Sequence, residues 1–211
     1  MNVTIPYGVK RKLRQWLPGL RRHAAGEIFE GFQVSSHDVV VDFGCGPGHS
    51  CAIAGEVGAD VVAIDVDAGA VEHARRMVEQ TPARSFQGLV GDAATQQLPD
   101  GAATVVLAQE VLEHVPAPAA TLTELVRIGR AGTRYLISVP DPVSEGLMRS
   151  VAPSWYFERP GHINVFEHET LDQLIRAAGL TIEKRVLSGA YWSIWWTLRW
   201  TTGKHIGPRS L

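Results

Sequence analysis

The feature that most constrains this chain of 211 residues is a run of glycines that directly follows a short apolar stretch. Residues 39–41 are three valines, and Gly44, Gly46 and Gly48 soon follow at every second position. Branched apolar residues favour a buried strand, whereas closely spaced glycines favour a tight turn and allow a ligand to approach backbone N–H groups. The pattern therefore predicts a strand, a turn and a helix whose free N–H groups face a small-molecule site.

The spacing of the glycines distinguishes two kinds of nucleotide-type site. Dinucleotide-binding folds carry G-x-G-x-x-G, in which the third glycine would stand where this chain has His49. The run Asp42 to Gly48 instead reads D-x-G-x-G-x-G, and it resembles the first motif of the class I S-adenosylmethionine-dependent methyltransferases. An NAD-dependent oxidoreductase is kept as a distant alternative.

Polar side chains end the next three predicted strands. Asp65 ends the strand predicted at 59–65, Asp92 follows the strand at 85–90, and Gln109 follows the strand at 104–108. Ligands of open α/β sheets bind beyond the carboxyl ends of the strands, so these side chains should line one site together with the glycine turn.

The resemblance implies that S-adenosylmethionine lies across these strand ends. Asp65 would accept bonds from the ribose hydroxyls and Val66 would contact the adenine, while Asp42 would organise the glycine loop by accepting backbone N–H bonds. The cofactor-binding residues that the resemblance implies are Asp42, Gly44, Cys45, Gly46, Asp65, Val66, Asp92, Ala93 and Gln109.

The order of the strand and helix patterns predicts an α/β fold, a Rossmann-like seven-stranded mostly parallel sheet with helices on both faces. We predict a single domain over 1–211, with an N-terminal helical segment at 1–35 (helices near 9–20 and 24–32) and a substrate-recognition insertion at 141–168. Residues 192–200 alternate between large apolar and other side chains, which favours an antiparallel strand near the C-terminus. A Trp-rich lid is the alternative for this tail.

Two histidines are the candidate catalytic residues. Methyl transfer from a sulfonium requires alignment and desolvation, and a hydroxyl acceptor also requires a base, for which imidazole is suited at neutral pH. His114 follows the strand at 104–108 and His162 lies in the insertion. A surface or capping role is the alternative for each.

A metal site is a further hypothesis. Glu110, Glu113 and His114 have the spacing of one helix face, and His162 could complete the set. This E-x-x-E-H string is similar to that of metal-dependent methyltransferases that modify small-RNA 3′ ends, which would imply Mg²⁺ or another divalent ion, and a similar string occurs in ubiquinone-pathway O-methyltransferases. Because such strings are common in relatives that use no metal, we assign no metal ligand from the sequence.

Composition and charge bear on partners and location. The net charge of −2 gives no general attraction for nucleic acid. The two cysteines, Cys45 and Cys51, predict a reducing, cytoplasmic setting without disulfides, and no leader or spanning segment is evident. Both ends of the chain are basic and rich in tryptophan, which predicts peripheral contact with a membrane. The oligomeric state is left open.

We therefore expect methyl transfer from S-adenosylmethionine to a small-molecule or lipid-like acceptor at an oxygen atom. The aromatic residues Trp155, Tyr156 and Phe157 of the insertion favour an apolar or ring-containing acceptor. Two alternatives are an RNA 2′-O-methyltransferase, supported by the cluster around Glu113 and the basic ends, and a non-catalytic partner protein that binds the cofactor.

Overall fold

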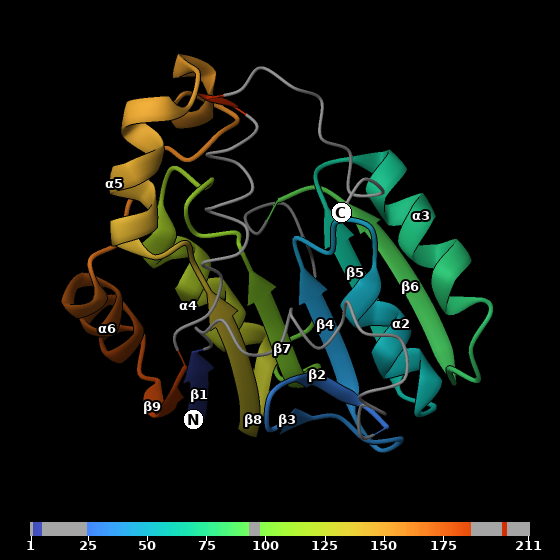
Figure 1. The fold of residues 1–211 in the computed structure, drawn as a ribbon. Helices are drawn as coiled ribbons and strands as arrows, with labels where there is room; N and C mark the ends of the chain where they lie inside the picture. Colours follow the sequence, from blue (N-terminus) through green and yellow to red (C-terminus); the bar gives the residue numbers. More distant parts are fainter. Residues whose placement is uncertain (1, 6–24, 93–97, 187–199, 202–211) are drawn as a thin grey trace.

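The computed structural model describes residues 2–5, 25–92, 98–186 and 200–201 of the chain. Its centre is a seven-stranded sheet with the order β6-β5-β4-β7-β8-β1-β9, and the paired strands run parallel (Figure 1). In chain order the strands are β1 (Asn2–Ile5), β4 (Val39–Phe43), β5 (Asp60–Asp65), β6 (Ser85–Val90), β7 (Ala103–Gln109), β8 (Gly129–Ser138) and β9 (Thr181–Arg185).

Helices cover both faces of the sheet, as predicted. The helices are α2 (His49–Glu56), α3 (Ala68–Val78), α4 (Pro118–Ile128), α5 (Pro142–Val151) and α6 (His168–Ala177), with a 3₁₀ turn, η1, at Ser154–Phe157. The apolar side chains of α2 and α3 pack on one face of the sheet, and those of α4 and α6 pack on the other. Parallel strands that are buried on both sides in this way are expected to be almost continuously apolar.

Alternation along the central strands divides the core between these two layers. Val41 and Phe43 of β4 join the core cluster formed with α4 and α6, whereas Val40 joins the cluster formed with α2 and α3. Successive side chains of a strand point to opposite faces, so a strand with no polar residue at these positions fits only the middle of a covered sheet. This places β4, and the loop that follows it, at the centre of the molecule.

The strand order reverses beside β4. The chain moves from β4 outward through β5 to β6, then returns to β7 on the other side of β4 and continues to β8. Such a switch point leaves a crevice at the carboxyl ends of the two central strands, because the connections leave them in opposite directions. The glycine loop after β4 and the residues after β7 flank this position (Figure 1).

The helix predicted near 24–32 is wrong. Residues 27–33 form an antiparallel hairpin of β2 (Glu27–Phe29) and β3 (Phe32–Gln33). Gly26 and Gly31 both have positive φ, 77° and 80°, which interrupts a helix and suits turns, and Glu27 accepts the N–H of Gly31. The apolar side chains Ile28 and Phe32 are buried in the core cluster that also contains side chains of α2 and α3. The apolar spacing that suggested a helix therefore comes from the buried face of the hairpin.

The ends of the chain differ from the prediction in one respect that the structure describes. The seventh strand is β1, which lies at the N-terminus, within the segment predicted to be helical, and runs parallel to both β8 and β9. The helix predicted at 9–20 and nearly all of the antiparallel strand predicted at 192–200 lie outside the described residues; Trp200 is helical. None of the helices in the described part of the chain has the length and hydrophobicity needed to cross a bilayer.

Candidate functional site

The glycine loop sits across the ends of two neighbouring strands. Gly44, Gly46 and Gly48 have positive φ values of 72°, 47° and 79°, which explains why glycine stands at each position. The N–H groups of Gly44 and Cys45 both donate to the carbonyl of Ile64, at 2.8 and 2.9 Å. The turn after β4 is thereby bonded to the end of β5.

The three glycines are open to solvent or ligand to different degrees. A Cβ on Gly44 would lie 2.4 Å from Val111 Cγ2, and one on Gly48 would lie 2.4 Å from the Cα of Ala74, so these two glycines permit close packing. A Cβ on Gly46 would have nothing within 4 Å. Gly46 therefore presents an uncovered stretch of backbone, which fits the close approach of a cofactor.

Asp65, at the end of β5, holds the loop in place. Its Oδ2 accepts the N–H of Gly46 and its Oδ1 accepts the N–H of Asp67, both at 2.9 Å. Each carboxylate oxygen has a second lone pair, so both remain able to accept from the ribose hydroxyls that the sequence predicted as ligands. Val66, the predicted adenine contact, follows directly and is 74% exposed.

Asp42 has a different surrounding from the one predicted. Its carboxylate is buried and accepts a hydrogen bond from the Cys51 thiol at 3.2 Å, while the loop amide of Gly46 goes to Asp65. Burial raises the pKa of Asp42 to about 6; the hydrogen bond from Cys51 opposes this shift, and the charge of Asp65 adds to it. A nearby cation, such as the sulfonium of the cofactor that the sequence resemblance implies, would favour the ionised form of this carboxyl group.

The remaining predicted contacts lie on the same edge of the sheet. Asp92 follows the end of β6 and is exposed, and Ala93 lies outside the described residues. Gln109 ends β7, and its Oε1 accepts the hydroxyl of Ser50 at 2.9 Å. The structure therefore brings the described cofactor-binding candidates to one edge of the sheet.

The segment after β7 is a turn and not the helix assumed for the E-x-x-E-H string. Glu110 has a left-handed φ of 57°, donates its N–H to the Ser138 carbonyl at 3.0 Å and accepts the Ser138 hydroxyl at 2.8 Å. Its side chain is thereby bonded to β8. The spacing argument fails because residues three and four apart share a face only in a helix.

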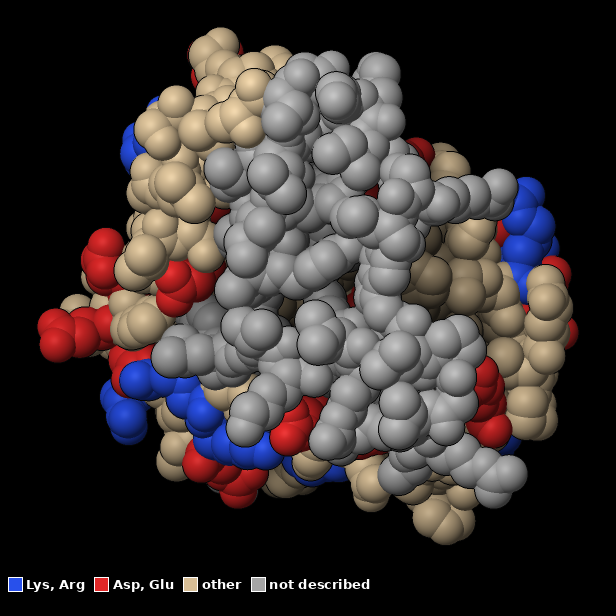
Figure 2. Space-filling view, viewed as in Figure 1, with Lys and Arg blue, Asp and Glu red and all other residues tan. Residues whose placement is uncertain are grey.

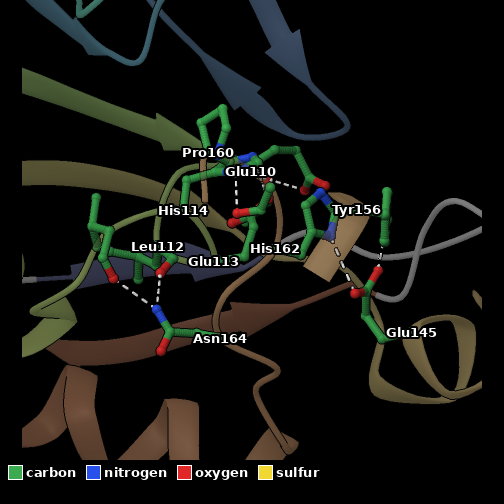
Figure 3. Close-up of polar contacts among 12 residues, drawn as sticks. Glu110, Leu112, Glu113, His114, Glu145, Tyr156, Pro160, His162 and Asn164 are labelled. Carbon is green, nitrogen blue, oxygen red and sulfur yellow. Dashed lines mark hydrogen bonds and ion pairs between the residues drawn. The ribbon is translucent and has the colours of Figure 1, made fainter. Parts of the chain in front are cut away.

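Three of the four residues of that hypothesis nevertheless come together. One ligand atom from each of Glu113, His114 and His162 lies within 4.8 Å of the others, and the two imidazole centroids are 4.9 Å apart (Figure 3). Asn164 holds the turn closed, because its amide donates to the carbonyls of Leu112 and of the residue after His114. These three residues are the described side chains that could hold a divalent cation, and Glu110 is not one of them.

Glu113 is the most deeply buried of these groups. Neither of its carboxylate oxygens has a hydrogen-bond partner among the residues that the structure describes, and His114 Nε2 lies 3.8 Å from Oε1. Burial raises the pKa of Glu113 well above its usual range, and the charges of Glu110 and Glu145 raise it further. The carboxyl group is therefore protonated more readily than an exposed glutamate.

Sequence reasoning missed two residues of this cluster, Glu145 of α5 and the hydroxyl of Tyr156. Glu145 accepts a hydrogen bond from Tyr156 Oη at 3.0 Å and lies 3.1 Å from His162 Nδ1. An acidic residue 17 positions from its partner carries no local signal. The helical pattern of α5 could have identified it, because Glu145 falls on the buried face with Met148.

Basic and acidic side chains alternate on the described surface. Figure 2 shows Lys and Arg beside Asp and Glu along the lower rim of the face that is visible there. Described arginines that pair with carboxylates are Arg75, Arg76, Arg84, Arg127, Arg134 and Arg185. These pairs reduce the net positive charge of this part of the surface.

Comparison with known proteins identifies the family to which this chain is similar. Residues 10–185 match the family described as a methyltransferase domain. The chain is 30% identical over 154 residues to trans-aconitate 2-methyltransferase of Methylobacterium radiotolerans, covering 67% of this chain and 57% of that protein. It is 29% identical over 161 residues to a ubiquinone biosynthesis O-methyltransferase of Aeromonas salmonicida, covering 73% and 66%. The chain spans between 30% and 66% of the length of the curated relatives that it matches.

A solved structure agrees with the fold. Geranyl diphosphate methyltransferase, determined in complex with S-adenosylmethionine, superposes with a TM-score of 0.53 at 21% identity, over 69% of this chain and 58% of that one. At 21% identity this structural similarity supports the fold alone. The family assignment rests on the match of residues 10–185. The chain thus belongs to the class I S-adenosylmethionine-dependent methyltransferases, whose cofactor is S-adenosylmethionine.

Proposed function

We propose that this chain transfers the methyl group of S-adenosylmethionine to a hydroxyl of a small-molecule or lipid-like acceptor. The observation that carries the proposal is the meeting of two imidazoles, His114 and His162, whose centroids are 4.9 Å apart. The turn that carries His114 also carries Val111, whose side chain fills the space in front of Gly44. A proton acceptor is therefore available next to the place where the methyl donor would lie.

The proposed reaction is a direct displacement. The acceptor hydroxyl gives its proton to an imidazole nitrogen, its oxygen bonds to the methyl carbon, and the bond from that carbon to sulfur breaks. The electron pair of this bond stays on sulfur and leaves neutral S-adenosylhomocysteine. Because the donor is already activated by its charge, the protein mainly aligns and desolvates the reactants, which is worth roughly 7–11 kcal/mol in good geometry.

The aromatic side chains of the insertion support an apolar or ring-containing acceptor. The ring of Tyr156 is 4.2 Å from that of His162 and 5.1 Å from that of Trp200, and Trp155 is 60% exposed beside them. Relatives named for ubiquinone biosynthesis, tocopherol and trans-aconitate methylation are in keeping with small or lipid-like acceptors. Contact of the basic chain ends with a membrane stays a prediction, because most of those ends lie outside the described residues.

The test is a methyl-transfer assay with S-adenosylmethionine labelled in its methyl group. The acceptor panel contains simple phenols, prenylated quinols, unsaturated carboxylic acids and a short RNA. We expect label in the phenol or quinol products, absent with Asp65→Ala protein. Label in the RNA alone would replace the proposal by the RNA alternative, and cofactor binding without any product would favour the non-catalytic partner protein.

A further inference from the structure

The insertion contains a buried carboxylate, Glu145. Glu145 lies on α5 with 2% of its surface exposed, whereas Glu158, in the same insertion, is fully on the surface. Burying a carboxylate is costly unless it is hydrogen-bonded. Glu145 has two partners, Tyr156 Oη at 3.0 Å on one oxygen and His162 Nδ1 at 3.1 Å on the other (Figure 3).

The contact with Glu145 decides which nitrogen of His162 carries the proton. An ionised carboxylate only accepts hydrogen bonds, so Nδ1 must be the donor in this pair. Nε2 then keeps its lone pair and is free to take a proton from an acceptor. The hydroxyl of Tyr156 donates to the other oxygen of Glu145 and keeps the carboxylate in this orientation.

His114 has a weaker arrangement for the same task. Its Nδ1 lies 3.0 Å from the backbone carbonyls of both Pro160 and Gly161, and these oxygens carry no net charge. Hydrogen bonds to a charged partner are about twice as strong as neutral ones, so a carboxylate stabilises an imidazolium better than a carbonyl does. The side chain of His114 is also 39% exposed, against 16% for His162.

We propose that His162 is the base of the reaction and that Glu145, held by Tyr156, is the residue that positions it. The assignment rests on the proposed function. The acceptor proton moves to His162 Nε2 as the new bond from oxygen to carbon forms and the bond from carbon to sulfur breaks, and the Glu145 carboxylate accepts the Nδ1–H of the imidazolium. The base, its positioning acid and the tyrosine all come from residues 141–168, so acceptor recognition and proton removal share one insertion.

The first test needs no acceptor. Side-chain ¹⁵N NMR of the protein with S-adenosylhomocysteine reports which ring nitrogen of each histidine is protonated. We expect the Nδ1–H form for His162 in the wild type and in Glu158→Gln, and a lower population of that form in Glu145→Gln, because an amide donates as well as accepts. An Nε2–H form of His162 in the wild type would overturn the proposal, and this reading remains available even if Glu145→Gln does not fold.

The second test uses the acceptor found with the methyl-transfer panel, in the presence of EDTA. We expect Glu145→Gln to lower kcat by about 100-fold while the Kd for S-adenosylmethionine is unchanged, and His162→Gln to lose no further activity when Glu145→Gln is added. Independent, multiplicative losses would overturn the proposal, as would His114→Gln losing as much activity as His162→Gln. A wild type that is inactive in EDTA would also overturn it, because the imidazoles would then act as metal ligands. An empty acceptor panel would contradict the proposed function and leave the NMR result standing.

Discussion

The predicted cofactor region and the proposed acceptor region of this molecule are built in opposite ways. The cofactor region is backbone at the ends of adjacent strands, with Gly44 and Gly46 in a conformation that other residues rarely adopt and Asp65 bonded to their loop. The acceptor region is a set of side chains, Glu113, Glu145 and His162 among them, from a turn, a helix and a loop that meet in space.

The difference shows why one fold can serve many acceptors. A loop of backbone amides between fixed strands binds the same cofactor whatever surrounds it, so its requirements fall on a short run of residues. Side chains that converge from separate segments can change one at a time, and here most of them lie in the insertion and its neighbouring turn. Changes in the two regions should therefore affect different steps of the reaction.

The largest expected effect separates chemistry from cofactor binding. We expect His162→Gln to lower kcat by roughly 10²–10⁴-fold, because a positioned base contributes that much to a proton-transfer step. The Kd for S-adenosylmethionine, measured by calorimetry, should stay within a factor of two or so of the wild type. His37→Gln, on the exposed turn before β4, is the matched control. A loss of cofactor affinity in His162→Gln would show that the two regions are coupled.

The next largest effect distinguishes two glycines of the loop after β4. Gly44→Ala forces a left-handed residue to carry a Cβ 2.4 Å from Val111, so we expect it to lower the free energy of unfolding by about 2–4 kcal/mol. Gly46→Ala has open space around its Cβ and should lose only about 1 kcal/mol of stability while still weakening cofactor binding. Urea titrations and calorimetry on both variants check this. Equal losses of stability would contradict the distinction between the two glycines.

A smaller effect concerns the pH dependence of stability. The pKa of Asp42 is about 6 in the folded protein, above its value in the unfolded chain, so the folded state binds the proton more tightly. Protonation of Asp42 contributes its full stabilisation below about pH 4, and this contribution is lost as the pH rises through 6. The loss lowers the free energy of unfolding by about 2–3 kcal/mol. Asp42→Asn should therefore be more stable than the wild type at pH 7.5. Its free energy of unfolding should also change less between pH 4 and 6 than that of the wild type.

The control for Asp42 has the opposite sign. Hydrogen bonds from Arg84 and Ser85 lower the pKa of Asp60, so Asp60→Asn should lose stability at neutral pH and lose less as the pH falls below 4. Thermal unfolding of both variants across this range checks the pair. An Asp42→Asn protein that is less stable than the wild type at pH 7.5 would show that the carboxylate is stabilised by contacts beyond the Cys51 thiol.

The contrast between the two regions also explains which features could be predicted from the sequence. Strands ending at Asp65 and Gln109 were predictable because each is a continuous apolar run followed by a polar residue, and the glycine spacing separated two cofactor classes. The helical pattern of α5 indicates that Glu145 is buried, but its pairing with His162 could not be predicted, because only the packing of α5 brings the two side chains together. The hairpin at 27–33 was mistaken for a helix because Ile28 and Phe32 fit both periods, and the two glycines decided the outcome.

The measurement that tests the account most directly is calorimetric titration with S-adenosylmethionine of the wild type, Asp65→Ala and Asp60→Ala. Asp60 is the matched control, since it lies at the opposite end of the same strand. The account predicts that the wild type and Asp60→Ala bind alike and that Asp65→Ala binds at least about 30-fold more weakly, the loss expected when a charged hydrogen-bond acceptor is removed. Equal binding by all three proteins, or none by the wild type, would contradict a cofactor site at the ends of β4 and β5.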